Sequence, residues 1–236
     1  FCRGFVNPWG HHFDDWGQSF ATDGAYGEGI NYVFPGAVFV TAPQARRVLH
    51  GLNPGSPKHC GLEILSGRHL PVAMRGNMVT NDFRANRVCR FVVSENRSGF
   101  ASRQEAELIK TRHVAFRPID VKMGPDGAIY IADWYNPIIQ HGEVDFRDDR
   151  RDHTHGRIWR ITAKGRPLLK MPRLAGAGIE ELLGQLRAPE AWVRLWAKRM
   201  LKTKSAAEVV QALSDWLSAL DPQDAEFERL RVEALW

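Results

Sequence analysis

The clearest pattern in the chain is a complete β-meander between residues 116 and 162. Val121 and Met123 alternate with polar neighbours, and a Pro-Asp-Gly turn then leads into a second apolar run at 128–132. Alternation of period two bounded by a Pro/Gly turn predicts a β-hairpin. A third apolar run follows at 158–161. We interpret these three strands as one blade of a β-propeller.

Two earlier segments repeat this plan. Residues 1–36 predict part of a first blade, with two short strands around a turn at 15–17. Residues 59–110 predict three strands, and a fourth near 99–103. The last two units share an apolar strand that ends in Asn-Asp or Ala-Asp and is followed by RVCRF or GRIWRI. Such self-similarity is typical of a propeller, and three blades would leave its ring open. We therefore expect an excerpt, the C-terminal part of a propeller.

The pattern becomes helical after a Gly- and Pro-rich stretch. Apolar residues recur at helical spacing in three stripes, and Asp221-Pro222 predicts the start of a fourth helix. Short helices that are each apolar on one side are typical of HEAT or armadillo repeats. The predicted organisation is a partial propeller at 1–165, a linker at 166–178 and the start of HEAT-like helical repeats at 179–236.

Composition narrows the class of protein. The chain has 236 residues and a net charge of +5, and its basic residues are interleaved with acidic ones, as in FRDDRRD at 146–152. This pattern indicates a solvated surface and no nucleic-acid partner. Cys2, Cys60 and Cys89 are isolated, so they predict no disulfide framework, zinc site or haem attachment site. The sequence contains no membrane-span run and no signal peptide.

The segment 135–155 is far longer than a hairpin requires and is dense in His, Asp and Arg. Loops of this length are usually functional or disordered. His153 and His155 lie two residues apart, so in an extended segment they face one side and could bind one metal ion or one substrate oxygen. Together with His141 they are the candidate catalytic residues. The alternative is a loop that caps the blade through Arg–Asp pairs, which is favoured for its Asp and Arg residues and stays open for its histidines.

Charged residues at strand ends form a second candidate set. Asp82, Arg84 and Arg87 follow the end of a predicted strand, where a guanidinium could bind a carboxylate or phosphate with two hydrogen bonds. Arg117 and Asp120 bracket the start of the third blade. A surface salt bridge is the favoured alternative for the first group, and the second pair is ambiguous by itself.

Two further groups could take part in binding or catalysis. Tyr135 and Asn136, after Asp133 and Trp134, could give hydrogen bonds and a stacking face to a sugar or planar cofactor. Packing of Trp134 between blades is the alternative. The motif HHFDD at 11–15 has the form of a general base with a carboxylate that orients it. A polar strand end is the favoured interpretation of that motif.

Several long motifs resemble the membrane-bound dehydrogenases of planctomycetes and their relatives. They are NPWGHHFDDWGQSFATDGAYGEGINYVFPG, GNMVTNDFRANRV, HVAFRPIDVKMGPDGAIYIADWYNPIIQHGEVDFRDDRRDHTHGRIWR and LRAPEAWVRLWAKRML. The resemblance covers nearly the whole chain. It implies a glucose/sorbosone-dehydrogenase-like propeller joined to HEAT-like helices, often followed by a haem-binding cytochrome c module. It also implies a parent protein that is exported, periplasmic or membrane-associated.

A more distant resemblance is to soluble quinoprotein sugar dehydrogenases, whose propeller binds pyrroloquinoline quinone and calcium. The segment FRPIDVKMGPDGAIYIAD is similar to their last blade, where two arginines contact the quinone. Arg117 matches the first arginine, and Ile119 stands at the second. Arg84 is the basic residue nearest to their cofactor-binding lysine, and their catalytic histidine has no match here. Their calcium-binding loop lies near the segment similar to NPWGHHFDDWGQSFATDGA, and no metal ligand is assigned here.

The resemblance therefore implies hydride transfer from a sugar or polyol to a quinone, and electron transfer to a haem module outside this chain. The candidate cofactor-binding residues are Arg84, Arg117, Asp82, Asp120, Tyr135 and Asn136. The lost second arginine motivates an alternative function, a non-catalytic propeller scaffold that binds glycans or partner proteins. A propeller fold hosts both kinds of function.

Overall fold

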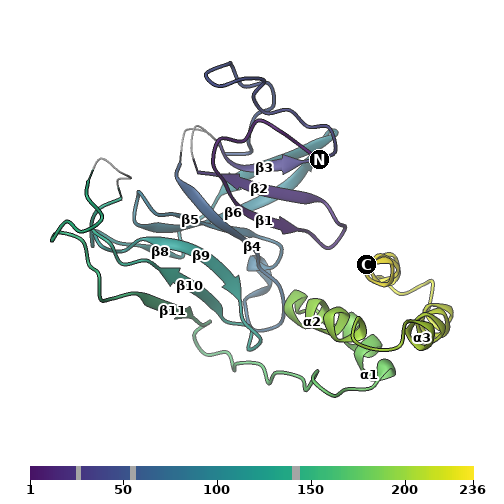
Figure 1. The fold of residues 1–236 in the computed structure, drawn as a ribbon. Coiled ribbons are helices and arrows are strands. Elements are labelled where there is room, and N and C mark those ends of the chain that lie inside the picture. The colour runs from purple at the N-terminus through teal and green to yellow at the C-terminus, as the bar shows by residue number, and fades with distance from the viewer. Residues whose placement is uncertain (25–27, 54–56, 140–143) are drawn as a thin grey trace. The chain divides into compact units, whose positions relative to one another are not determined.

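The computed structural model describes residues 1–24, 28–53, 57–139 and 144–236 and divides the chain into two compact units. The first, which we call the β unit, comprises residues 1–65, 74–122 and 129–161. The second, the helical unit, comprises residues 66–73, 123–128 and 162–236. The regular structure of the described residues is mainly β-sheet, with four α-helices in their C-terminal part (Figure 1).

Three antiparallel meanders follow one another along the chain (Figure 1). The first contains β1 (Pro8–Phe13), β2 (Ser19–Asp23) and β3 (Gly29–Val33). The second contains β4 (His59–Ile64), β5 (Met78–Asp82), β6 (Arg87–Asn96) and β7 (Gly99–Gln104), and β8 (Ile109–Lys110) also pairs with β6. The third contains β9 (Pro118–Met123), β10 (Ile129–Asp133) and β11 (Arg157–Ile161). The predicted strands, including the fourth strand of the second meander, are confirmed.

The first two meanders share a hydrophobic core. Phe20 and Ile30 of the first meander pack in one cluster with Leu62, Met78 and Phe91 of the second. Burial of such aliphatic and aromatic side chains is the main favourable term in folding. The middle strands β2 and β5 are buried along their whole length because both of their faces are covered.

The first strands of successive meanders lie side by side. A Cβ atom on Gly10 of β1 would lie 2.4 Å from the carbonyl carbon of Gly61 in β4, so the two backbones are in direct contact. Gly61 has a φ of +65°, and a Cβ there would lie 2.7 Å from Asp120 Oδ1 on β9. Lys122 of β9 donates a hydrogen bond to the carbonyl of Leu62 at 3.0 Å. This order of β1, β4 and β9 is the arrangement expected for consecutive propeller blades.

The helical unit contains α1 (Ile179–Gly184), the 3₁₀ turn η2 (Gln185–Arg187), α2 (Ala191–Leu201), α3 (Ala206–Ser218) and α4 (Phe227–Leu235). The prediction that a helix starts at Asp221-Pro222 was wrong. Asp221 accepts a hydrogen bond from the backbone N–H of Gln223 at 2.9 Å and forms a turn. Asp side chains often stabilise such turns by bonding their own backbone two residues on. No helix in the described part of the chain has the length and apolar character needed to cross a membrane.

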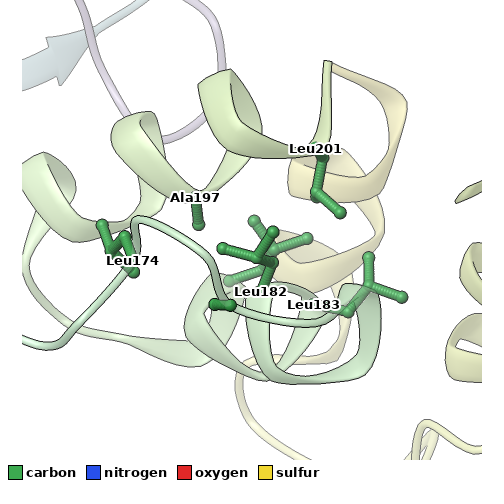
Figure 2. Close-up of a cluster of buried hydrophobic side chains, with 7 residues drawn as sticks. Leu174, Leu182, Leu183, Ala197 and Leu201 are labelled. Atoms are coloured by element: carbon green, nitrogen blue, oxygen red, sulfur yellow. The ribbon is translucent and has the colours of Figure 1, made fainter. Parts of the chain in front are cut away.

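The core of the helical unit joins α1 and α2 to the segment that precedes them (Figure 2). Leu182 and Leu183 of α1 pack against Ala197 and Leu201 of α2. Leu174, from the Gly- and Pro-rich segment, is buried in the same cluster. Residues 162–178 therefore belong to the helical unit and are not a free tether.

His69 holds the start of this segment in place. Its Nδ1 lies 2.9 Å from the carbonyl of Pro167, and its Nε2 accepts a hydrogen bond from the backbone N–H of Ala163 at 2.9 Å. A carbonyl can only accept, so Nδ1 carries the proton and the ring is the neutral Nδ1–H tautomer. Arg166 adds a hydrogen bond to the carbonyl of His69 at 2.7 Å.

Candidate functional site

An aspartate ends the second strand of each meander: Asp23 in β2, Asp82 in β5 and Asp133 in β10. The side chain of Asp23 accepts hydrogen bonds from the backbone N–H groups of Val6 and Asn7, just before β1. Asp82 pairs with Arg87 across the next turn at 3.0 Å. The strand-ending aspartate, which the sequence repeats in the last two units, is therefore also present in the first. Each of the three carboxylates has partners within its own meander.

The carboxylate of Asp133 accepts four hydrogen bonds. Its Oδ1 accepts from the backbone N–H groups of Arg117 at 2.8 Å and Tyr135 at 3.0 Å. Its Oδ2 accepts from Arg157 Nε at 3.1 Å and from Trp159 Nε1 at 2.9 Å. The side chain is fully buried. Asp133 thus fixes the entry to β9, the exit from β10 and the side chains of β11.

Arg117 is buried, and its guanidinium bonds main-chain carbonyls. It donates to Asn136 at 2.9 Å, to Phe83 at 2.9 Å, to Arg84 at 3.4 Å and to Pro137 at 3.2 Å. These bonds tie the β5–β6 turn to the segment after β10. Burial lowers the pKa of the guanidinium from its ordinary value, and the charge of Asp133 acts in the opposite sense. A guanidinium with four carbonyl partners has little capacity left for a ligand.

The β5–β6 turn, whose carbonyls Arg117 of the third meander binds, also lies near the first meander. Trp9, at the start of β1, is half exposed, and its ring lies 6.4 Å from the ring of Phe83 on the β5–β6 turn. Arg84, the next residue on that turn, is exposed. We call Trp9, Phe83 and Arg84, with the Arg117–Asn136 contact beside them, the strand-end site. It offers an aromatic surface and a cation at one end of the aligned first strands.

Tyr135 belongs to a separate cluster over the third meander. It has a φ of +56°, and its ring lies 3.7 Å from the Arg157 guanidinium. His113 stacks against it with centroids 5.8 Å apart, and His155 approaches its edge. Cation and imidazole contacts of this kind stabilise an aromatic ring at a surface. Asn136 is buried, and its side chain accepts a hydrogen bond from the backbone N–H of Ile138, so it forms a turn.

The long loop is held together largely by its own residues. Arg151 is buried and donates to the carbonyls of Asp145 at 3.0 Å and Val144 at 3.1 Å. Asp152 accepts from the backbone N–H groups of Thr154 and His155, and these bonds together with the imidazole of His155 lower its pKa to about 2. Arg150 also pairs with Asp148 at 2.8 Å, and such local Arg–Asp pairs are what the capping alternative predicts for this loop.

Two of the three candidate histidines, His153 and His155, lie in the part of the loop that the structure describes. His141 lies outside the described residues. His153 and His155 are exposed, and His155 pairs with Asp152 at 2.9 Å. Among the residues that the structure describes, no group of three or more His, Cys, Asp or Glu side chains is arranged to hold a metal ion.

Charged and polar side chains lie along the aligned first strands β1, β4 and β9. Their pairing was not predicted from the sequence. His12 Nε2 on β1 lies 2.8 Å from Glu63 Oε1 on β4. On β9, Lys122 Nζ lies 3.8 Å from Asp120 Oδ1, and both side chains are about half exposed. The HHFDD motif therefore does contain a histidine paired with a carboxylate. The carboxylate, however, comes from Glu63 in the next meander and not from the adjacent aspartates.

Both ring nitrogens of His12 face acceptors. Nδ1 lies 2.6 Å from the carbonyl of Phe13, and Nε2 faces the Glu63 carboxylate. Burial alone would lower the pKa of His12, but the hydrogen bond to Glu63 and its negative charge outweigh burial and raise the pKa above 6.5. An imidazolium, which donates from both nitrogens, satisfies this geometry. The pair is thus a partly buried ion pair between two meanders.

We expect the His12–Glu63 pair to make stability depend on pH. Because the folded-state pKa of His12 is raised, its stabilisation is fully present below pH 6.5, the unfolded value, and is lost as pH rises through the folded value. The variant His12→Gln should therefore lower the free energy of unfolding by about 1 kcal/mol at pH 6, and by much less at pH 9. Urea unfolding of both proteins across this range measures the difference. An equal loss at both pH values would contradict an ionised pair.

Comparison with known proteins found one matching family model. The family model described as Domain of unknown function (DUF7133) matches residues 3–165. A search of curated proteins found no match.

Nine chains among the solved structures are similar in part, and these include two aldose sugar dehydrogenases. One is the apo form of the soluble aldose sugar dehydrogenase from Escherichia coli, with 18% identity and a TM-score of 0.45 over 56% of this chain and 43% of that one. The other is the PQQ-bound aldose sugar dehydrogenase from Streptomyces coelicolor, with 16% identity and a TM-score of 0.43 over 58% of this chain and 40% of that one. The chain thus spans about two-fifths of the length of these proteins.

Proposed function

The chain belongs to the family described as Domain of unknown function (DUF7133), and we propose that its β unit is an arc of a sugar-dehydrogenase-like propeller that oxidises a sugar or polyol through a quinone cofactor. The helical unit would be the start of HEAT-like repeats, and electrons would pass to a haem module of an exported or membrane-associated parent protein. The observation that supports this proposal is the strand-end site. There the Trp9 ring of the first meander lies near Phe83 on the β5–β6 turn of the second, and Arg117 of the third bonds the carbonyls of Phe83 and Arg84.

The residues of this site suit part of a quinone site. Pyrroloquinoline quinone, when bound, supplies a two-electron acceptor for hydride. Arg84 would bind one of its carboxylates, and the Trp9 ring would lie against its planar rings. Arg117 would act only by holding the β5–β6 turn in place, since its N–H groups bond four carbonyls. Ile119, at the position of the second arginine, offers no charge.

The test is reconstitution of the protein that contains this chain with pyrroloquinoline quinone and calcium, followed by dye reduction over a panel of aldoses and polyols. We expect cofactor-dependent reduction, and we expect Arg84→Ala to weaken quinone binding about tenfold or more through loss of a charged hydrogen bond. Arg97→Ala, at the exposed β6–β7 turn, is the matched control. Absence of both quinone binding and turnover would end the proposal.

The engagement of Arg117 favours one alternative, a non-catalytic scaffold that binds glycans or partner proteins. Trp9 would then serve as a stacking surface for a sugar ring. Glycan binding that Trp9→Ala abolishes, in a protein that neither binds the quinone nor reduces the dye, would support this function. The Tyr135 cluster, whose ring already contacts Arg157 and His113, offers less free surface for a sugar.

A further inference from the structure

Helix α3 is apolar, yet it has no buried residue within the described structure. Its sequence, AAEVVQALSDWLS, places Val209, Leu213 and Trp216 at the edge of the helical core, where they are only partly covered. Val210, on the neighbouring face, is 67% exposed. A helix in a globular protein usually buries its apolar stripe, whereas the stripe of α3 is only partly covered by the described residues and Val210 at its edge is exposed.

A groove of about 370 Å³ runs along this face of α3. It has an apolar floor and a basic rim. The floor includes Leu183, Leu186, Leu201, Val209 and Leu213, and the rim carries Lys198, Lys202 and Lys204 together with one carboxylate, Glu233. Lys198 is paired with Glu233 at 2.7 Å, so Lys202 and Lys204 supply the charge available to a ligand.

The other side of α3 has the opposite charge. There a second groove, of about 710 Å³, is lined by Glu180, Glu208 and Asp215. A flat anionic membrane would meet these carboxylates as well as the lysines, and two lysines contribute only about 1 kcal/mol each at such a surface. A narrow ligand that lies along one side of α3 avoids the repulsion.

We propose that the groove beside Lys202 and Lys204 binds an amphipathic α-helix whose apolar stripe is flanked by carboxylates. Ala206, Val209, Val210 and Leu213 recur at helical spacing along two turns of α3, which suits the i, i+3, i+4, i+7 anchors of a bound helix. The apolar stripe enters the groove, and Asp or Glu side chains at its edge pair with the two lysines. Complementary charge then sets the orientation of the bound helix and excludes basic helices.

Two synthetic helical peptides with the same leucine stripe test this proposal on the intact chain. One carries Glu and the other Lys at the flanking positions, and fluorescence anisotropy gives their dissociation constants. We expect the Glu peptide to bind about tenfold or more tightly than the Lys peptide, with a preference that shrinks as salt rises. The double variant Lys202→Glu/Lys204→Glu should reverse the preference.

The variant Val210→Asp separates groove binding from general charge attraction. Because Val210 is exposed, its replacement should leave the circular dichroism spectrum and melting temperature unchanged while weakening the Glu peptide about tenfold. Gln211→Asp adds the same charge on the acidic side of α3 and is the control that should bind normally. Equal binding of both peptides, no binding, or full binding by Val210→Asp would each overturn the proposal. Binding to anionic vesicles without binding to the Glu peptide would do the same.

Discussion

Replacement of Asp133 by alanine is expected to lower the free energy of unfolding of the β unit by about 3–5 kcal/mol. The fully buried carboxylate accepts two backbone N–H groups, the Arg157 guanidinium and the Trp159 indole. Its loss leaves these donors without an acceptor, and each buried unsatisfied donor costs about 1–3 kcal/mol unless water reaches it. Urea unfolding followed by tryptophan fluorescence measures the effect.

Two other variants make the Asp133 prediction specific. Asp133→Asn keeps the shape and one good acceptor but removes the charge opposite Arg157, so its loss should be intermediate. Asp149→Ala, in the exposed part of the long loop, should change the free energy of unfolding by less than about 0.5 kcal/mol. A loss of under about 1 kcal/mol for Asp133→Ala would show that the four hydrogen bonds contribute little.

Replacement of Glu233 by alanine is expected to destabilise the helical unit by about 3–5 kcal/mol. Glu233 of α4 is buried and accepts from Arg194 Nε at 2.5 Å and Lys198 Nζ at 2.7 Å, both on α2. Arg229 Nη1 lies 3.9 Å away on the same helix. Without the carboxylate, three cations remain close together and each loses its contact with a buried negative charge.

Thermal unfolding followed by helical circular dichroism tests the Glu233 prediction. Glu228→Ala removes an exposed α4 carboxylate that pairs with Arg231, and it should cost less than about 1 kcal/mol. The double variant Arg194→Met/Glu233→Leu should be more stable than Glu233→Ala, because it removes the buried guanidinium together with the carboxylate and fills the space with apolar side chains. If the double variant were the less stable of the two, the penalty would not come from an uncompensated charge.

Local patterns in the sequence were sufficient to predict the strands. In the third meander, period-two alternation and the Pro-Asp-Gly turn locate β9 and β10 because both are properties of neighbouring residues. The fourth helix shows the limit of such rules. Asp-Pro is a frequent helix start, but the Asp221 side chain bonds Gln223 and closes a turn instead.

The chemistry of the candidate residues was harder to predict because their partners are distant in sequence. His12 pairs with a carboxylate 51 positions later, an arrangement that depends on β1 lying against β4. Nothing in the HHFDD motif reports that contact. Arg117 illustrates a second difficulty: its four acceptors are main-chain carbonyls, which every residue has, so no side-chain pattern could reveal them.

The aspartates that end β2, β5 and β10 have a consequence for how such a chain could lengthen during evolution. Asp23 bonds residues just ahead of its own first strand, and Asp133 does the same through the backbone of Arg117. Because the first and third meanders each contain both halves of this fastening, a gene segment that encodes such a meander can be duplicated without losing it. A new copy would then need only a small residue, such as Gly10 or Gly61, where the backbone of its first strand contacts the first strand of the next meander.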